Sequence, residues 1–555
     1  MNKKIIVVIF TCIMSVLIVG SDARADVMSP GLKKVLQSLG SEEEVAVIVS
    51  LSDTVDLKKF KDKDKGLRRS RIIKALKSKS EKSQKNIKNF LKLNKVRKVK
   101  SFWIFNGLAF SANAELIEKL AAMDGIKSIR LNIAFSMSEP PVTASESLPE
   151  WNINAINAPE LWSRGYNGAG MVLASMDTGV DVNHQDLVSR WRGGSNSWYD
   201  PHGVYTTPHD GNTLGHGTKV MGVLVGGDAG GSVIGVAPGA QWISVKIFND
   251  AGGSNYDIIH DGYQWLLDPD GNPDTDDAPD VVNNSWGFPS TQGTCLSEFQ
   301  LDIQALKASG IAVVFSAGNG GPLAATSESP ADNPDSFAVG AVNEAQTITS
   351  FSSRGPSACD ESIFPEVMAP GVNIRTADLG NSYSYVWGTS IAAPHVAGAM
   401  GLLLNAYPFL SIEEIEAALT ASALDLGVSG PDNTYGYGLL DVMGAFNLLG
   451  QNHSQPPVAY NDIVIIPRNS TALINILAND IDPEDSIDAA SVIFRSGTAE
   501  DNTARGGSVV ANADGTISYI PEGGGGPDYF WYTVKDTAGA TSNEATVRIN
   551  RVRAQ

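Results

Sequence analysis

The chain has 555 residues, of which 43% are hydrophobic and 19% are charged. This length excludes a protein with one small core and predicts two or three domains. The composition is that of a globular, soluble protein, and the net charge of −19 is distributed unevenly. Residues 1–140 contain 27 Lys+Arg and 14 Asp+Glu, whereas the remaining residues contain 15 and 47. A basic N-terminal part therefore precedes an acidic body.

The first 25 residues have the pattern of a secretory signal peptide. Lys3 and Lys4 precede an apolar run over residues 5–19, and Ala23-Arg24-Ala25 offers small residues for cleavage. A membrane anchor is the alternative, although the run is short for a span. No second apolar stretch is long enough to cross a bilayer. We therefore expect an exported protein without a stable membrane span, which is secreted, extracellular, periplasmic or held at the cell surface.

The basic run over residues 58–100 has two interpretations. Clustered lysines and arginines are typical of nucleic-acid binding, but an exported protein rarely meets nucleic acid. We therefore expect this run to pair with the acidic body of the same chain. We expect a monomer, with no nucleic acid among its partners.

Residues 26–137 alternate between strand and helix patterns, which predicts a small α+β module of β-α-β-β-α-β type. A Lys-rich stretch in this module repeats apolar side chains at the helical period. The expected elements lie at residues 44–51, 67–93, 99–110, 114–123 and 125–131.

Residues 138–150 are rich in Pro, Ser and Glu and predict a linker, which is the natural place for cleavage. Over residues 151–449, short apolar strands alternate with helices. This alternation predicts an α/β fold with a mostly parallel sheet and helices on both faces. Active residues in such sheets lie at the carboxyl ends of the strands. The apolar segments lie at residues 171–176, 220–225, 241–247, 258–267, 281–284, 298–309, 311–316 and 337–341.

The pattern changes again after residue 449. Gly, Asn, Ser, Gln and two prolines interrupt the helical pattern over residues 450–457 and predict a second linker. Short strands separated by turn residues fill residues 458–555. They predict a small β-sandwich.

Cysteine use agrees with export. Cys12 lies in the predicted signal peptide, which leaves Cys295 and Cys359. An even pair in an oxidising compartment predicts a disulfide, which would be worth roughly 4 kcal/mol in the chain-entropy model. The alternative is two free, buried cysteines.

Three short motifs place candidate catalytic side chains in the body. Asp177 follows the predicted strand over residues 171–176, where it is well placed to orient an imidazole. His216 lies between two glycines at the start of a helix of small residues. Ser390 lies at the N-terminus of a buried helix of small residues, where backbone N–H groups and the helix dipole favour a developing oxyanion. Taken alone, that stretch is also explained as a Thr/Ser helix cap.

The order Asp, His, Ser on an α/β sheet is that of the subtilisin arrangement. The motifs Asp177-Thr-Gly, Gly215-His216-Gly-Thr and residues 388–395, Gly-Thr-Ser-Ile-Ala-Ala-Pro-His, resemble those of the subtilisin-like serine proteases, the subtilase family. The resemblance covers residues 151–449. The family usually has Met after the serine, where this chain has Ile391, which is an apolar exchange.

The resemblance implies the role of each side chain. Ser390 would attack the scissile carbonyl, His216 would take its proton and return it to the leaving amine, and Asp177 would hold the imidazole tautomer. Asn319, in the sequence Ala317-Gly318-Asn319, would donate its side-chain amide to the oxyanion together with the Ser390 backbone N–H. Taken alone, Asn319 is also explained as a turn residue in the left-handed backbone conformation.

Substrate binding follows from the same resemblance. Ser285, Trp286 and Gly287 follow a predicted strand, and the resemblance implies that they pair with an extended substrate as an added β-strand. Ala317 and Gly318 are the other substrate-binding candidates. The alternative for the first segment is a strand end with a core tryptophan.

An acidic loop provides a candidate metal site. Calcium requires six to eight oxygen ligands, and subtilases often bind it. The loop lacks the Gly and Glu spacing of an EF-hand, and a solvated acidic loop is the alternative. We expect no cofactor for the chemistry and allow one structural calcium. The candidate ligands alternate along the loop as Asp268, Asp270, Asn272, Asp274 and Asp276.

Both flanking regions also show resemblances. By its order of elements, the N-terminal module resembles the inhibitory propeptide of subtilases, which assists folding and blocks the cleft until it is removed. The C-terminal region resembles the cadherin-like or Ig-like repeats of bacterial exported proteins. Its motifs are residues 456–462, 476–480 and 529–536.

These features together predict a secreted serine endopeptidase that is made as a self-processing preproenzyme. Its partners would be protein or peptide substrates and its own propeptide. The alternative is a catalytically inactive scaffold of the same fold that acts as a surface or adhesion protein. The same acyl-enzyme would also permit esterase or ligase activity, although water as the acceptor makes hydrolysis the default.

Overall fold

The computed structural model describes residues 27–62, 64–137, 151–211, 214–452, 456–482, 487–522, 526–537 and 539–552. The predicted signal peptide, Cys12 and the predicted linker over residues 138–150 lie outside these residues.

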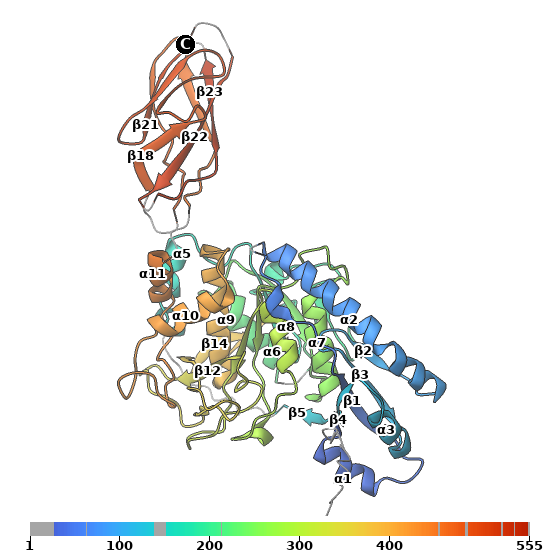
Figure 1. The fold of residues 1–555 in the computed structure, drawn as a ribbon. Helices are drawn as coiled ribbons and strands as arrows, with labels where there is room; N and C mark the ends of the chain where they lie inside the picture. The colour runs from blue at the N-terminus through green and yellow to red at the C-terminus, as the bar shows by residue number, and fades with distance from the viewer. Residues whose placement is uncertain are drawn as a thin grey trace, which may run out of the picture. The chain divides into compact units, whose positions relative to one another are not determined.

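The body is built on a seven-stranded sheet in which every neighbouring pair is parallel, with the order β13-β12-β11-β10-β6-β8-β7. The four strands β10, β11, β12 and β13 are buried along their whole length. This burial explains why apolar residues predominate in β11, β12 and β13, whereas β10 ends in two buried asparagines. The predicted α/β class is confirmed (Figure 1). The strands are β6 (Val172–Asp177), β7 (Trp198–Tyr199), β8 (Gln241–Lys246), β10 (Val281–Asn284), β11 (Ala312–Ser316), β12 (Phe337–Val342) and β13 (Val367–Pro370).

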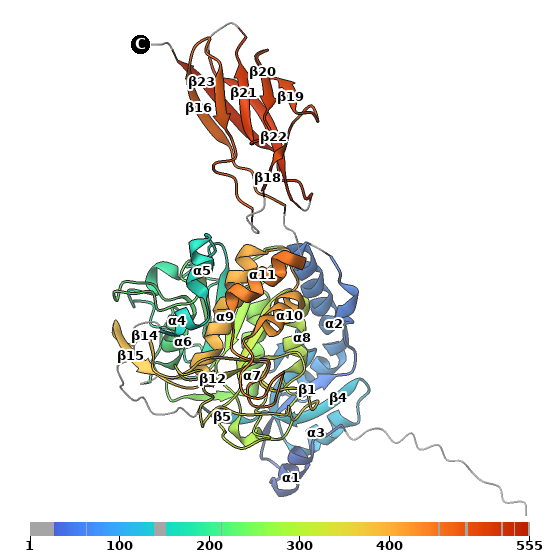
Figure 2. The same cartoon turned by 90° about the vertical axis from the view of Figure 1, so that its left-hand side faces the viewer.

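Helices pack around this sheet, and α9 (Thr389–Ala406) is the most buried of the long ones. It packs against β10, β11, β12 and β13 (Figure 2). A helix that is apolar on all sides belongs in the core, and its small residues let it approach the sheet closely. The other helices of the body are α4 (Trp151–Ala155), α5 (Ala158–Ser163), α6 (His216–Val225), α7 (Tyr256–Leu267), α8 (Gln300–Ala308), α10 (Ile412–Ser422) and α11 (Val442–Asn452).

The N-terminal module contains a four-stranded sheet of order β2-β3-β1-β4. Strand β1 pairs antiparallel with both β3 and β4. Val47, Val49, Leu108 and Ile129 belong to its buried core. The elements are α1 (Pro30–Ser38), β1 (Val45–Leu51), α2 (Lys65–Leu93), β2 (Lys100–Phe102), β3 (Gly107–Ala112), α3 (Ala114–Ala121) and β4 (Ile126–Leu131).

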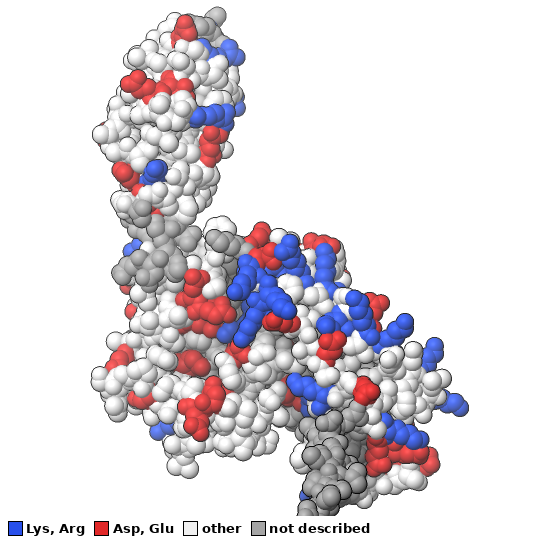
Figure 3. Space-filling model, in the orientation of Figure 1, with Lys and Arg blue, Asp and Glu red and all other residues white. Residues whose placement is uncertain are grey.

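The first part of α2, residues 65–82, belongs to the same compact unit as the body, and lysine and arginine side chains gather along α2 (Figure 3). Arg69 is buried and its Nη1 lies 2.6 Å from Asp276 Oδ1. Three lysines of this helix also form ion pairs with the acidic loop, which are the kind of pairs that the charge asymmetry predicts. They are Lys65 with Asp280, Lys74 with Asp274 and Lys77 with Asp268.

The C-terminal region is a β-sandwich of two four-stranded sheets, which confirms the predicted class. Alternating side chains of β22 (Asp528–Asp536) and β23 (Ala545–Val552) are buried, as expected for strands with one face in a core. The remaining strands are β16 (Asp462–Pro467), β17 (Ala472–Asn475), β18 (Ile487–Phe494), β19 (Glu500–Asn502), β20 (Ser508–Ala511) and β21 (Thr516–Ile520).

Cys295 and Cys359 form a disulfide, which closes a loop between two positions that are 64 residues apart in sequence. Among the described residues, no helix is long and apolar enough to cross a membrane.

Replacing both Cys295 and Cys359 with serine should lower the free energy of unfolding by roughly 2–4 kcal/mol, because the unfolded chain gains loop entropy. Chemical denaturation followed by circular dichroism measures this change. The wild type treated with a reductant should lose a similar amount, and an unchanged transition in both experiments would contradict a stabilising disulfide.

Candidate active site

Asp177 and His216 meet at the carboxyl end of the sheet. Asp177 is the last residue of β6, and His216 is the first residue of α6. His216 Nδ1 lies 2.8 Å from Asp177 Oδ1, and both side chains are buried. Because a carboxylate oxygen accepts hydrogen bonds, Nδ1 is the donor in this contact, and Nε2 is the nitrogen that can act as a base.

Two glycines allow this close approach. A Cβ on Gly217 would lie 2.1 Å from the carbonyl oxygen of Gly179. Gly179 itself has φ +114°, and its Cβ would lie 2.0 Å from the carbonyl oxygen of His209. A larger residue at position 217 would push α6 away from the end of β6 and so separate His216 from Asp177. A larger residue at position 179 would collide with the loop that precedes α6.

Ser390 is the second residue of α9, directly after the N-cap Gly388 and Thr389. Gly388 has φ +137°, which residues with side chains rarely adopt. Pro394 lies four residues after Ser390 and has no N–H, so the Ser390 carbonyl lacks its helical donor. The hydroxyl of Ser285 donates to this carbonyl at 2.6 Å. The end of β10 is thereby tied to the start of α9.

The Asn319 side chain is oriented by the same helix start. The backbone N–H and the hydroxyl of Thr389 both lie 3.0 Å from Asn319 Oδ1. Because a backbone N–H can only donate, the Asn319 atom that faces it is the oxygen. The NH₂ group of Asn319 is therefore directed away from Thr389.

His395 supports the helix as a neutral imidazole. Its Nδ1 lies 2.9 Å from the carbonyl oxygen of Ile391, and its Nε2 lies 2.8 Å from Asn152 Nδ2. The first contact requires a donor at Nδ1, and the second requires an acceptor at Nε2. Burial lowers the pKa of His395 from 6.5 to about 4, because the buried ring loses the water that would stabilise its charged form.

His216, Ser390 and Asn319 line one cavity of about 290 Å³. Of the predicted substrate-binding residues, Ser285, Trp286, Gly287 and Gly318 line it as well. Ala317 is buried, and its N–H donates to Val339 O at 3.0 Å. Apart from Trp387, which directly precedes the motif over residues 388–395, the sequence did not single out the other lining residues as part of a site. They are Met137, Pro289, Gln292, Ser316, Glu328, Phe351 and Trp387.

A short strand from the N-terminal side of the linker leads to this cavity. Strand β5 (Ala134–Ser136) pairs antiparallel with β9 (Gly253–Asn255), and the Met137 N–H donates to Gly252 O at 3.0 Å. The Phe135 ring contacts the rings of Phe248, Tyr256 and Phe288, with centroids 4.7 to 6.1 Å apart. An extended segment of the chain is thus held beside the predicted catalytic residues.

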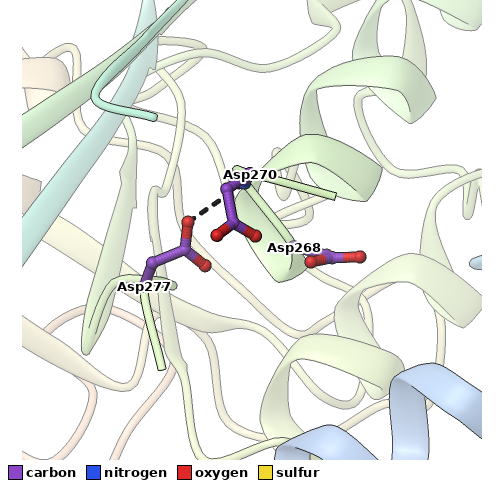
Figure 4. Close-up of side chains that lie close together, drawn as sticks. All are labelled: Asp268, Asp270 and Asp277. Atoms are coloured by element: carbon purple, nitrogen blue, oxygen red, sulfur yellow. Dashed lines mark hydrogen bonds between the residues drawn. The ribbon is translucent and has the colours of Figure 1, made fainter. Parts of the chain in front are cut away.

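The acidic loop brings together only part of the predicted metal set. Ligand atoms of Asp268, Asp270 and Asp277 lie within 4.8 Å of one another (Figure 4). Asp277 Oδ2 accepts from the Asp270 backbone N–H at 3.0 Å. Carboxylate oxygens suit calcium, but with one oxygen from each carboxylate the cluster supplies three of the six to eight ligands that calcium takes.

The other three predicted ligands make different contacts. Asp274 and Asp276 pair with Lys74 and Arg69, and Asn272 Oδ1 accepts from the Asp274 backbone N–H at 3.2 Å. Lys77 also pairs with Asp268. A calcium ion in this loop therefore stays a prediction.

Two family models match the chain. The model described as the subtilase family matches residues 168–438, and the model described as a bacterial Ig domain matches residues 454–550. The first match includes Asp177, His216, Asn319 and Ser390. The second covers the β-sandwich.

The chain is also similar to several known proteins. It is 39% identical over 403 residues to Bacillopeptidase F of Bacillus subtilis (strain 168), which covers 65% of this chain but only 27% of that protein. It is 36% identical over 304 residues to Subtilisin of Bacillus pumilus, which covers 54% of this chain and 99% of that protein. Subtilisin DY of Bacillus licheniformis is 36% identical over 297 residues, with coverages of 53% and 97%.

The pKa of His395 predicts how stability depends on pH. Between pH 6.5 and about 4, the unfolded chain binds a proton at His395 and the folded chain does not. Stability is therefore fully present above pH 6.5 and falls by about 3 kcal/mol as the pH drops through this window. Chemical denaturation above and below the window should show a correspondingly weaker pH dependence in His395→Gln, which cannot take up this proton. Equal pH dependence in both proteins would show that His395 is not held neutral.

Proposed function

Because the chain belongs to the subtilase family, we propose that it is a serine endopeptidase whose nucleophile is Ser390. The observation that carries this proposal is the Asp177–His216 hydrogen bond of 2.8 Å, made by a histidine that shares one cavity with Ser390 and Asn319. In α/β folds, active sites lie at the carboxyl ends of the strands. A base, a hydroxyl and an amide that meet there favour acyl transfer as the reaction class.

The proposed reaction has two halves, formation and hydrolysis of an acyl-enzyme, and the same side chains act in both. His216 Nε2 takes the proton of the Ser390 hydroxyl as Oγ attacks the carbonyl carbon of the substrate. The NH₂ of Asn319 and the Ser390 backbone N–H stabilise the oxyanion. His216 then protonates the leaving amine, which leaves an acyl-enzyme. Water attacks the acyl carbon and gives a proton to His216. The bond between Ser390 Oγ and the acyl carbon then breaks, Oγ takes the proton from His216, and the acid is released. Asp177 stabilises the imidazolium in both halves.

The rival proposal is a scaffold of the same fold without catalysis. It requires none of the polar contacts around Ser390. The orientation of the Asn319 amide by Thr389 and the tie between Ser285 and Ser390 favour the enzyme, because a scaffold would gain little from placing these groups at one cavity.

Two substitutions test the enzyme proposal. Ser390→Ala should abolish cleavage of a denatured protein substrate, and Asn319→Ala should lower kcat about 100- to 1000-fold, because one oxyanion donor is lost. The rate of Asn319→Ala is measured with matured enzyme. Ser390→Ala is expected to remain as the unprocessed precursor, so it is assayed after a trace of wild-type enzyme has cut its linker in trans and has been removed. The exposed Phe409→Ala serves as the control and should retain wild-type rates. Cleavage by Ser390→Ala would refute the assignment.

We further propose that the N-terminal module acts as an intramolecular inhibitor that is removed by self-processing within residues 138–150. The support is β5, which adds a strand to β9 and leads through Met137 into the cavity, the way an extended peptide would bind. Export follows from the N-terminal pattern, and the β-sandwich would serve attachment or spacing outside the cell.

Phe135→Asp should slow self-processing roughly tenfold, because the charged side chain leaves the aromatic contacts that hold β5 in place. Gel electrophoresis of the full chain over time measures the conversion of precursor to mature protein. Phe409→Asp is the matched control at an exposed position. Equal conversion rates for the two variants would count against a role of β5 in presenting the linker.

A further inference from the structure

The cavity beside Ser390 has an acidic group between its two walls. Glycines at 287 and 318 face the Glu328 carboxyl group: a Cβ on Gly318 would lie 2.5 Å from Glu328 Cδ, and a Cβ on Gly287 would lie 3.5 Å from Glu328 Oε2. Gly287 is two residues from Ser285, and Gly318 is next to Asn319. The carboxylate therefore lies between the segment that would bind the substrate backbone and the segment that would hold the oxyanion.

Glu328 is buried without a cationic partner. Its side chain lines the cavity although the residue is only 4% exposed. Gln292 Nε2 donates to Glu328 Oε1 at 3.1 Å. Burial, and secondarily the charge of Asp332, raises the pKa of this carboxyl group. Within the described part of the chain, no lysine or arginine lines the cavity or forms an ion pair with Glu328.

A buried carboxylate with one neutral donor is costly unless something compensates for it. A positively charged ligand in the cavity would supply that compensation, and it would be drawn in by an unpaired charge in a place with little water. Gly287 and Gly318 place no side chain over the carboxylate, which therefore lines the cavity.

We propose that Glu328 makes the enzyme prefer substrates with lysine or arginine immediately before the scissile bond. This inference rests on the proposed function, because that function places the scissile carbonyl of the substrate at Ser390 with its oxygen toward Asn319. The side chain of the same substrate residue then enters the space between Gly287 and Gly318 and pairs with Glu328. The linker over residues 138–150 contains no lysine or arginine, so self-processing relies instead on the high effective concentration of a tethered segment.

The test compares peptides that differ only in the residue before the scissile bond, which is Arg, Lys, Leu or Glu. We expect the matured enzyme to show the highest kcat/KM for Arg and Lys. In Glu328→Gln, the ratio of kcat/KM for Arg to that for Leu should fall at least about 30-fold, because one partner of a buried charge pair is lost. Phe409→Ala, at an exposed position outside the cavity, is the control and should keep the preference for Arg and Lys.

A fluorophosphonate probe that labels Ser390 separates the two levels of the proposal. If the wild type is not labelled and cleaves none of the peptides, the proposed function fails. If it is labelled and cleaves the Leu or Glu peptide best, or if Glu328→Gln keeps the wild-type ratio, the enzyme stands and the role of Glu328 is overturned. Circular dichroism of Glu328→Gln, with labelling of Ser390, establishes that a lost preference is not lost folding.

Discussion

The carbonyl oxygen of Ser390 is a buried acceptor whose own helix cannot satisfy it. Proline at position 394 removes the N–H that would reach it, and the hydroxyl of Ser285 replaces that donor at 2.6 Å. Leaving this acceptor unpaired would cost about 1–3 kcal/mol. One hydrogen bond therefore joins the first turn of α9 to the end of β10, and the residues that follow Ser285 become one wall of the cavity.

The other contacts at the helix start depend on the same arrangement. Thr389 orients the amide of Asn319, so that the wall carrying Gly318 is also fixed relative to Ser390. His395, one turn further along α9, donates to the carbonyl of Ile391 and accepts from Asn152. The carbonyl oxygens of Ser390 and Ile391, in the first turn of α9, thus each accept a hydrogen bond from a side chain. Such contacts hold the nucleophile in one position.

Much of this arrangement follows from the sequence. The order of the Asp177, His216 and Ser390 motifs and the apolar strands before them indicated the α/β sheet and the carboxyl-end position of the site. The close approach of Gly217 to Gly179 explains why small residues surround His216. The sequence also indicated a sandwich after residue 457, because short strand patterns are separated there by turn residues.

The residues that sequence reasoning missed reach the site by packing between distant segments. Glu328 lies in a loop without any recognisable motif, and only the facing glycines at 287 and 318 reveal where its carboxylate lies. In the acidic loop, by contrast, sequence reasoning predicted more site residues than the structure brings together. The loop's four aspartates and one asparagine at alternate positions suggested five ligands. However, Arg69 and Lys74, about 200 residues away in sequence, pair with two of the aspartates. Spacing along one segment does not show which partners a second segment brings.

The most direct measurement of the α9 arrangement is the rate at which a fluorophosphonate probe modifies the matured protein, with the modified residue located by mass spectrometry. It is made on the wild type, Ser285→Ala, Pro394→Ala and the double variant. The probe should modify Ser390, Ser285→Ala should slow the reaction, and the slowing should be much smaller when alanine at position 394 supplies the missing N–H. Modification of a different serine, or equal slowing by Ser285→Ala with proline or alanine at position 394, would contradict the proposed positioning of the nucleophile.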